Sequence, residues 1–427
     1  MRTLKEEQRP RVLLGATTWW PLSARLAMAL IRHGCRVSAI CPPGHPLRFV
    51  SGIETLYPYH GLDSLGALRS AILASQPSLI VPCDDGVVWQ LHELHAREAT
   101  LRPLIEYSLG PAETYPVIRS RDALLHAAGE LGIRVPATQT LVAEDELTSW
   151  LQDAQVVLKL DGTWGGSGVV VAHSAAEALA AFRRLSRPMG TSLVWKRWLI
   201  NRDPLAWWYW RRQEKPSVSI QQFIPGRPAN AMLACWKGEV LGIVTVEVLT
   251  SQGATGAATV VRLIKNNEIE RAATLLARRF DLNGFHGLDF MLEDGTDLPY
   301  LIELNPRCTQ LGHLRLPVQG DLAGLISAKL GGSLDSEDAS FSPEETIEGN
   351  TVAFFPQTFT WNPKSPYLKS SYHDVPWEEP ALVRELLRTS WPERQILSRI
   401  YHHFRAPKRP GEVKFHSETT LTAPNSK

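Results

Sequence analysis

The sequence predicts an α/β region followed by an α+β region: a parallel sheet layered with helices, and then antiparallel strands mixed with helices. Residues 11–41 read strand, helix and strand, and residues 78–86 repeat the pattern of an apolar strand followed by a polar turn. Strands that alternate with helices are typical of a parallel sheet. Between residues 155 and 290 most apolar runs are strand-like, and the runs around Lys237-Gly238 predict an antiparallel hairpin.

Helix boundaries follow from end signals. Pro21 suits a first helical position and Gly34 suits a helix stop, so the first helix is expected from Pro21 to His33. Asn267 is expected to cap a helix that ends at Phe280. A further short helix is expected around residues 380–400.

Composition excludes several classes of protein. The chain has 427 residues, which predicts two or three domains, and 44% hydrophobic with 21% charged residues is typical of a soluble globular protein. The net charge of +1 gives no electrostatic reason to expect nucleic acid or a membrane surface as partner. The five cysteines occur singly and the N-terminus has no signal-peptide pattern, so we expect a cytoplasmic protein.

Polar residues interrupt one apolar run, LPYLIELNPRC, in a regular way. Side chains alternate along a strand, so Glu303 and Asn305 share a face and Arg307 follows them. Asp289 lies on a neighbouring predicted strand. Three oxygen donors on one face predict a site for a hard cation such as Mg²⁺. The alternative interpretation is an edge strand whose acids face solvent.

A second run, VVLKLDGTWGGSGVVV, reads strand, glycine-rich turn and strand. Lys159 would present an ammonium group to phosphate, and the glycines would let backbone amides approach phosphate oxygens. The spacing differs from that of a P-loop. A flexible turn without a ligand is the alternative.

Together these segments resemble the ATP-grasp superfamily. The likeness covers about residues 11–330 and is carried by RSRD at 119–122, VVLKLDGTWGGSGV, SIQQFIPGRPAN, GLDFML and YLIELNPR, in the order that the family uses. It implies a Rossmann-like N-terminal domain at 1–112 and an ATP-grasp domain at 113–335 with a lid at about 150–225. From their composition, residues 336–427 are expected to form a C-terminal extension with a disordered tail.

The resemblance also implies roles for particular residues. The metal ligands would be Asp289, Glu303 and Asn305, and the groups that act on phosphate or substrate would be Lys159, Arg262 and Arg307. The nucleotide would be bound by Arg121, Lys159, Gly165, Gly166, Ser167, Gly168, Gln221, Gln222, Ile224 and Asn230. ATP is the implied cofactor with Mg²⁺, or Mn²⁺ in its place.

Two departures from the family pattern bear on these roles. Gln221 and Asn230 stand near positions where many members carry acids that hold the ribose, so we expect a weaker ribose contact. Gly287 occupies the place of an arginine found in D-alanine ligases, which argues against a dipeptide product of that kind.

The resemblance implies an ADP-forming ligase that activates a carboxylate as an acyl phosphate and joins it to an amine. The alternatives are an ATP-grasp carboxylase, an acid–thiol ligase, or a nucleotide-binding regulatory protein without turnover. The partners expected are small carboxylates and amines; a homodimer is left open.

Some segments leave more than one interpretation. The Asp84-Asp85 pair is interpreted as a solvated turn, with a ligand-facing sheet edge as the alternative. His286 and His313 are interpreted as surface or capping residues, and Cys308 as a packing residue. The Trp-rich segment 195–215 is interpreted as an insertion that packs on its own lid or a second subunit, binds a membrane surface, or covers the active site.

Overall fold

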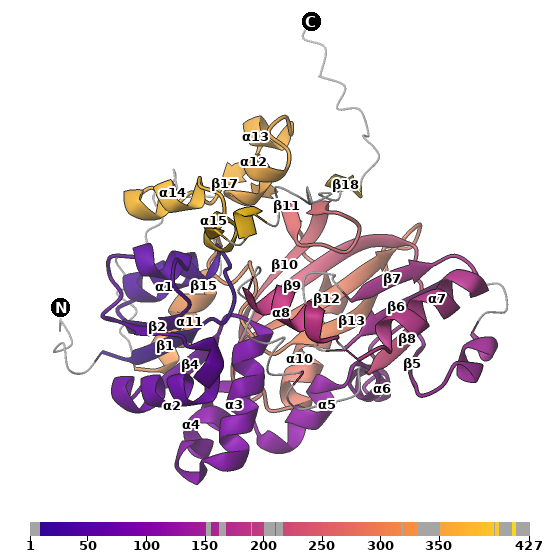
Figure 1. Cartoon of the computed structure of the whole chain (residues 1–427), viewed down its shortest axis with the longest axis horizontal. Coiled ribbons are helices and arrows are strands. Elements are labelled where there is room, and N and C mark those ends of the chain that lie inside the picture. Colours follow the sequence, from indigo (N-terminus) through magenta and orange to yellow (C-terminus); the bar gives the residue numbers. More distant parts are fainter. Residues whose placement is uncertain are drawn as a thin grey trace, which may run out of the picture.

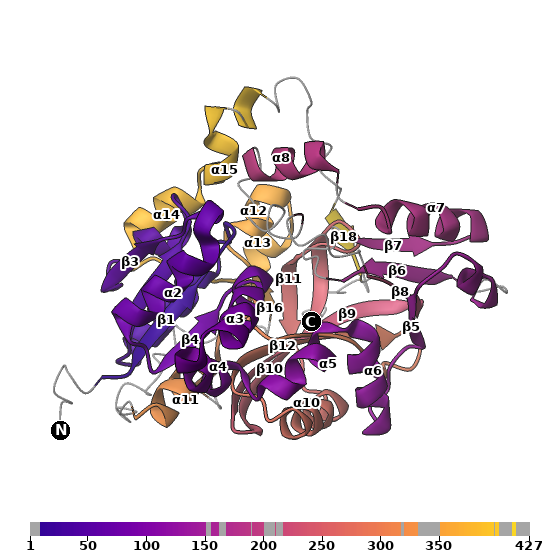
Figure 2. The ribbon, with the colours of Figure 1, turned by 60° about the horizontal axis from the view of Figure 1, so that its bottom comes forward.

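The fold consists of three larger sheets and one two-stranded sheet in the part of the chain that the structure describes (Figure 1). It was obtained as a computed structural model, which describes residues 9–150, 155–161, 168–188, 190–199, 210, 217–316, 320–331, 351–396, 398–400 and 412–415. In Figures 1 and 2 the N-terminal sheet and the lid sheet, defined below, lie on opposite sides of the molecule, with the large sheet between them.

The N-terminal sheet is parallel, with strand order β3-β2-β1-β4. This confirms the predicted α/β region. Its strands are β1 (Arg11–Gly15), β2 (Arg36–Cys41), β3 (Thr55–Pro58) and β4 (Leu79–Pro82), and its helices are α1 (Ser23–Arg32), α2 (Ser64–Ser75), α3 (Asp85–Arg97) and α4 (Arg102–Leu109). The carboxyl ends of β1 and β4 lie side by side, which brings Thr17 and Thr18 against Asp84.

The lid sheet is antiparallel, with order β5-β8-β6-β7. Leu158, Val218 and Ile220 pack with Phe182 in one core, so the alternate residues Lys159, Ser219 and Gln221 lie on the other face. The elements here are α5 (Tyr115–Arg119), α6 (Arg121–Glu130), β5 (Thr138–Leu141), β6 (Val156–Leu160), β7 (Val169–Ala172), α7 (Ala175–Leu185), α8 (Thr191–Leu199) and β8 (Val218–Gln222).

The large sheet has the order β13-β12-β9-β10-β11-β16-β17, with β18 paired to β10. Its strands are β9 (Gly226–Trp236), β10 (Glu239–Gln252), β11 (Ala258–Leu263), β12 (Gly284–Glu293), β13 (Pro299–Asn305), β16 (Thr351–Ala353), β17 (Tyr372–His373) and β18 (Glu412–Lys414). The remaining elements are α10 (Asn267–Arg279), β14 (Arg315–Leu316), β15 (Gly320–Asp321), α11 (Leu322–Lys329), α12 (Gln357–Trp361), α13 (Tyr367–Ser370), α14 (Pro380–Leu386) and α15 (Trp391–Arg394).

Alternation along β9 divides the large sheet between two cores. Met232 and Ala234 pack with α1, α11 and the N-terminal sheet, whereas Leu233 and Cys235 pack with α6 and α10. Both faces are therefore covered, which explains the continuous apolar runs of these strands. The predicted hairpin is confirmed, because Lys237 (φ 48°) and Gly238 (φ 72°) form the tight turn between β9 and β10.

Three sequence-based expectations need correction or fall outside the described residues. Asn266, not Asn267, caps α10: its side chain accepts hydrogen bonds from the backbone of Glu268 and Ile269. The helix expected around 380–400 is two short helices, α14 and α15. In the Trp-rich segment, residues 200–209 and 211–216 lie outside the described part; within α8, the Trp195 and Trp198 rings meet edge to face.

The segment after residue 350 is joined to the rest of the fold through hydrogen bonds and buried charges. β16 extends the large sheet beside β11. The buried Asp374 carboxylate accepts from Phe355 N at 2.6 Å, contacts His313 Nε2 at 2.9 Å and lies 3.4 Å from Arg25 Nε. Burial opposes ionisation of Asp374, but Arg25 and then His313 outweigh burial and lower its pKa. The division of the chain into residues 1–112, 113–335 and 336–427 remains a proposal.

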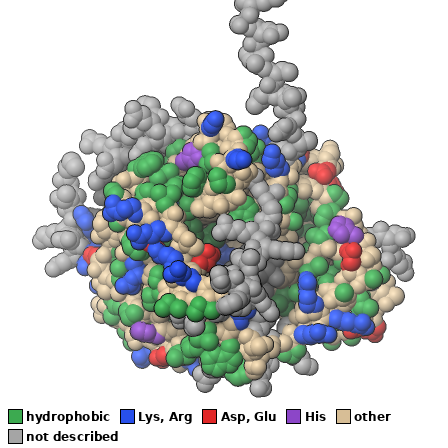
Figure 3. Space-filling model, turned by 45° about the horizontal axis from the view of Figure 1, so that its top comes forward, with side chains coloured by type: hydrophobic (Ala, Val, Ile, Leu, Met, Phe, Trp, Pro, Cys, Tyr) green, Lys and Arg blue, Asp and Glu red, His purple; other side chains and the backbone are tan. Residues whose placement is uncertain are grey.

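The described surface carries its charges in patches. On the face drawn in Figure 3, Lys and Arg side chains lie in separate groups with hydrophobic and uncharged side chains between them. Among the described residues, the helices are all too short or too polar to span a membrane.

We predict that Asp374→Asn lowers the free energy of unfolding by about 3–5 kcal/mol at neutral pH, because it leaves the buried Arg25 without its counter-charge. Folding lowers the pKa of Asp374, so its contribution is present above the pKa of an unfolded aspartate, about 3.9, and disappears as pH falls through the folded value. Denaturant unfolding of both proteins at several pH values measures this. Glu54→Gln, in the exposed Arg36–Glu54 pair, is the control; an equally small effect of both substitutions would contradict the prediction.

Candidate active site

Strand register brings the predicted metal ligands together on one face of the large sheet. Glu303 on β13 lies opposite Asp289 on β12, and Asp289 lies opposite Asn230 on β9. Asn230 Nδ2 donates to Asp289 Oδ1 at 2.5 Å, and Asn305 Nδ2 donates to Asp289 Oδ2 at 2.9 Å. The cluster therefore holds two carboxylates and two amides, on the face that is turned toward the N-terminal sheet.

The two carboxylates influence each other's ionisation. Burial, and then the nearby charge of Glu303, raises the pKa of Asp289 to about 6. Burial also opposes ionisation of Glu303, but the charges of Arg121 and Lys159 outweigh burial and lower its pKa. Cations thus compensate Glu303 more fully than Asp289, and negative charge is concentrated where another cation would be stabilised.

Arg121 joins the lid sheet to β13, the strand that carries the predicted metal ligands Glu303 and Asn305 and is called the metal strand below. Its Nη1 lies 2.6 Å from Asp161 Oδ1, just after β6, and its Nη2 lies 2.7 Å from Glu303 Oε1. Its Nε is buried without a hydrogen-bond partner. The two acids outweigh burial and raise the pKa of Arg121, which keeps this guanidinium charged. The first residue of α6 therefore holds two parts of the site together.

Lys159 lies in the same cluster and is 7% exposed. Burial, and then the charge of Arg121, lowers its pKa to about 8, while Glu303, Asp289 and Asp161 act in the opposite direction. Its place on β6 turns its ammonium toward the carboxylates, as the alternation along VVLKL predicts.

Arg307 reaches the cluster from the loop after β13. Its Nε donates to Asp85 Oδ1 at 2.9 Å, and its Nη2 donates to Asn305 Oδ1 at 3.3 Å. Burial opposes the charge of Arg307, but Asp85 more than offsets burial and raises its pKa. The N-terminal sheet thus orients a cation of the metal strand.

The interpretation of Asp84-Asp85 as a solvated turn is wrong. Asp84 caps α3 and accepts hydrogen bonds from the backbone N–H groups of Thr17, Thr18 and Val87, and Asp85 pairs with Arg307. The alternative interpretation, a sheet edge that faces the site, describes Asp85. Both acids lie at the carboxyl end of β4, where ligand sites of α/β sheets form.

The donor set of this cluster suits a hard divalent cation. Asp289, Glu303 and Asn305 offer carboxylate and amide oxygens, which Mg²⁺ prefers, and the raised pKa of Asp289 reflects negative charge that a cation would neutralise. Among the described residues, no group of three His, Cys, Asp or Glu side chains is arranged to hold a metal. The candidate site therefore depends on the amide of Asn305 as its third donor.

The hinge between the lid sheet and the large sheet contains Gln221, Gln222 and Ile224, three of the residues predicted to bind the nucleotide. Gln221 shares the face of Lys159, and its Nε2 donates to Thr138 Oγ1 at 3.0 Å. Gln222 N donates to Ala137 O, and Phe223 N donates to Gln155 O, so strand β8 is anchored where it ends. Ile224 is buried directly before β9.

The structure does not bring Arg262 to this cluster. Register pairs Arg262 with Glu247 and Glu247 with Ala229, the residue beside Asn230, so Arg262 lies on the opposite face of the sheet. Arg262 forms an ion pair with Glu247 there. Its placement does not support the predicted contact with phosphate.

Packing and hydrogen bonds within the fold account for the other residues that the sequence analysis discussed. His286 is fully buried and contacts Asn283 O at 2.7 Å. The side chain of His313 is 8% exposed and contacts Asp374, so the surface interpretation is wrong for both. Cys308 is buried, and burial raises the pKa of its thiol to about 12, which suits a packing residue. An added Cβ at Gly287 would clash with Thr309 Cγ2, so a larger residue there would displace Thr309.

The glycine-rich turn is only partly described. Gly165, Gly166 and Ser167 lie outside the described residues, whereas Gly168 O accepts from Leu160 N at 2.9 Å and closes the β6–β7 hairpin.

Sequence reasoning missed Asp161 as a functional residue and reached Asp85 only through the alternative interpretation. Asp161 follows Lys159 by two positions, so strand alternation was the signal that could have found it. Asp85 stands at the carboxyl end of a parallel strand, and that position was its signal.

Comparisons with known proteins identify the fold. Residues 209–310 match the family model of an ATP-grasp domain. The fold is similar to N5-carboxyaminoimidazole ribonucleotide synthetase from Thermus thermophilus, with 17% identity, a TM-score of 0.54, and 76% of this chain and 79% of that chain covered. No curated protein sequence matches the chain.

Two further solved structures share the fold. One is N5-carboxyaminoimidazole synthase from Aspergillus clavatus in complex with ADP and 5-aminoimidazole ribonucleotide, with 17% identity, a TM-score of 0.53, and 77% of this chain and 79% of that chain covered. The other is the biotin carboxylase domain of 2-oxoglutarate carboxylase from Hydrogenobacter thermophilus with MgADP, ADP and bicarbonate, with 12% identity, a TM-score of 0.53, and 79% and 72% covered. The chain is therefore a protein with the ATP-grasp fold.

We predict that Glu303→Gln abolishes Mg²⁺-dependent ATP turnover and leaves the fold intact, because the amide keeps the shape and removes the charge that would hold the cation. Asn305→Ala should act in the same direction. ADP release and the thermal midpoint measure the two effects separately. Glu293→Gln, at the far end of β12, is the matched control; near-normal turnover of Glu303→Gln would remove the metal assignment.

We predict that Arg121→Ala and Lys159→Ala each weaken ATP binding and slow phosphate transfer. The loss of transition-state stabilisation should be about 2–4 kcal/mol in each variant, as for other lost buried charge-assisted contacts. Arg121 is the larger of the two cationic influences on Glu303, so Arg121→Ala should also move the acidic limb of the pH–rate profile upward, and Arg121→Lys should restore part of that limb. Unchanged kinetics in both alanine variants would overturn the phosphate role.

Proposed function

We propose that this protein is an ATP-dependent, ADP-forming ligase that joins a small carboxylate to an amine. One observation carries the proposal: Asp289, Glu303 and Asn305 share one face of the large sheet, and Lys159, Arg121 and Arg307 approach them from three different parts of the chain. A purely structural cluster would not need this many unlike charges around two opposed carboxylates. The ATP-grasp fold supports the same assignment.

The chemistry requires charge neutralisation more than covalent assistance from the protein. ATP would supply the γ-phosphoryl group and Mg²⁺ the counter-charge. Transfer of this group to the carboxylate would release ADP, and the amine would then displace inorganic phosphate from the acyl phosphate. Lys159 holds phosphate charge, and Arg121 offers its unpartnered Nε to the same anion. Arg307, oriented by Asp85, holds the substrate carboxylate or the transferring phosphate.

The adenine would be bound by backbone groups of the hinge at Gln222 to Ile224. The predicted ribose contact of Asn230 is weaker than that of a family acid for a second reason: its Nδ2 already donates to Asp289. We therefore propose loose recognition of the ribose hydroxyls. Phosphate and metal contacts would provide most of the nucleotide affinity. Gly165, Gly166, Ser167 and Gly168 keep their proposed place over the phosphates.

A carboxylase reaction is the second candidate. Solved structures with this fold include enzymes described with bicarbonate or 5-aminoimidazole ribonucleotide, and bicarbonate is itself a small acid. We propose the cytoplasm as location, since all five cysteines are buried and unpaired. A homodimer stays a proposal; one similar structure is described as a dimer.

The test is ADP release from ATP and Mg²⁺ with a panel of carboxylates, bicarbonate included, against a panel of amines, followed by mass spectrometry of the product. We expect release that depends on both an acid and an amine, is absent in Glu303→Gln, and persists with 2′-deoxy-ATP. Nucleotide binding without acid-dependent release would instead indicate a regulatory protein. Release with bicarbonate alone as the acid would favour the carboxylase.

A further inference from the structure

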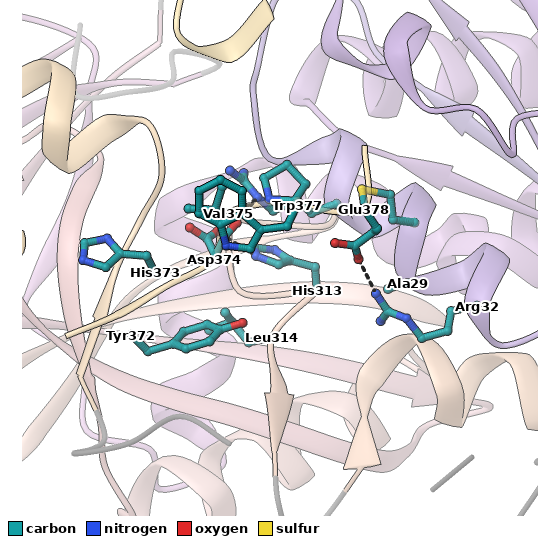
Figure 4. A pocket seen from close by; sticks show the side chains of 13 residues that line it. Ala29, Arg32, His313, Leu314, Tyr372, His373, Asp374, Val375, Trp377 and Glu378 are labelled. Atoms are coloured by element: carbon teal, nitrogen blue, oxygen red, sulfur yellow. Dashed lines mark hydrogen bonds and ion pairs between the residues drawn. The ribbon is translucent and has the colours of Figure 1, made fainter. Parts of the chain in front are cut away.

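A cavity of about 270 Å³ lies between helix α1, the loop that follows the metal strand, and residues 372–378 of the C-terminal segment (Figure 4). It is lined by Arg25, Met28, Ala29, Arg32, His313 and Leu314 on one side and by residues 372–378 on the other. The volume lies just below the range of about 300–1,000 Å³ that is typical of drug-sized ligands. A molecule of amino-acid size would fill it.

Arg25 supplies a buried cation with an unused donor. Its side chain is 4% exposed, its Nε donates to Asp374 O at 2.6 Å, and its Nη2 donates to Phe355 O. Its Nη1 has no hydrogen-bond partner. A buried guanidinium N–H without an acceptor is costly. Nη1 is itself closed to solvent, so Arg25 contributes its positive charge to the cavity rather than a hydrogen bond to a ligand.

The rim presents a second pair of charges. Arg32 Nη2 lies 3.2 Å from Glu378 Oε1, with 37% and 58% of the two side chains exposed, and Figure 4 marks this pair with a dashed line. An exposed pair of this kind is weak and opens readily. Beside it, Trp377 is 74% exposed, so its ring is available to cover an apolar ligand.

The charges of the cavity balance. Arg25 and Arg32 are matched by Asp374 and Glu378, and burial lowers the pKa of His313, which favours its neutral form. Asp374 is fully engaged with Arg25, His313 and Phe355 N, so Glu378 is the acid that can turn to a ligand. A ligand with one positive and one negative group would leave this balance unchanged.

We propose that this cavity binds an α-amino acid with an apolar side chain. Its carboxylate would meet Arg32 near the buried charge of Arg25, its ammonium would meet Glu378, and its side chain would lie against Met28, Leu314 and Trp377. This binding site is separate from the metal cluster, and it does not depend on the proposed ligase activity.

Isothermal titration of the whole protein, without nucleotide, tests the proposal. The probes are L-leucine and its two analogues that each lack one charge, 4-methylpentanoate and 3-methylbutylamine. We expect leucine to bind, and both analogues to bind at least about tenfold more weakly, since each loses a charge-assisted contact.

Variants then locate the site. Glu378→Gln should weaken leucine about tenfold without weakening 4-methylpentanoate, whereas Arg32→Gln should weaken both. Trp377→Ala should weaken leucine as well. These side chains are exposed, so their variants should fold; Arg25→Lys, in a buried position, is interpreted only if its thermal midpoint matches that of the wild type. Glu54→Gln, outside the cavity, is the control.

The proposal is overturned if leucine does not bind at millimolar concentration. It is also overturned if leucine binds equally well to the wild type, Glu378→Gln and Arg32→Gln, or if 4-methylpentanoate binds as tightly as leucine. If the wild-type protein binds leucine but releases no ADP with any acid and amine, the proposed ligase function is contradicted and this binding site is not.

Discussion

Two carboxylates, Asp289 and Glu303, lie opposite each other on adjacent strands, and the charge between them is the constraint on which the site depends. Burial opposes ionisation of both acids, and the charge of Glu303 further raises the pKa of Asp289. Compensation comes from α6 through Arg121, from β6 through Lys159, and from the loop after β13 through Arg307. The position of the lid sheet and of the N-terminal sheet relative to the metal strand is thereby tied to one electrostatic requirement.

Compensation by Arg121 also indicates how ligand binding would rearrange the site. This guanidinium is shared between Asp161 near the lid and Glu303 on the metal strand. A divalent cation at Asp289, Glu303 and Asn305 would take over the counter-charge of Glu303, and Arg121 would become available to phosphate. Asn305 would exchange its donor contact with Asp289 for a contact through its oxygen. The same residues that form a closed network of ion pairs would thus also form the proposed nucleotide complex.

The buried cluster around Asp374 differs from the active site in its charge balance. Asp374 accepts from a backbone N–H and meets Arg25 and His313, so its charge is matched within the protein. What stays unmatched there is a hydrogen-bond donor, Arg25 Nη1, rather than a negative charge. The first cluster therefore suits a cation, whereas the charges of the second are already matched within the protein. Residues 372–378 of the C-terminal segment form about half of the lining of the cavity beside this cluster, and β16 of the same segment extends the large sheet.

The sequence by itself determined which side chains share a face of a strand, because alternation is a property of neighbouring residues. Alternation predicts that Glu303 shares a face with Asn305 and that Lys159 lies opposite the lid core. The turn residues Lys237-Gly238 predict the hairpin. Contacts between distant segments could not be predicted: Arg307 meets Asp85 222 positions away, Arg121 meets Glu303 182 positions away, and Arg262 faces away from the site. Only the tertiary structure decided these, because strand register and the packing of one sheet on another depend on the whole chain and leave no local pattern in the sequence.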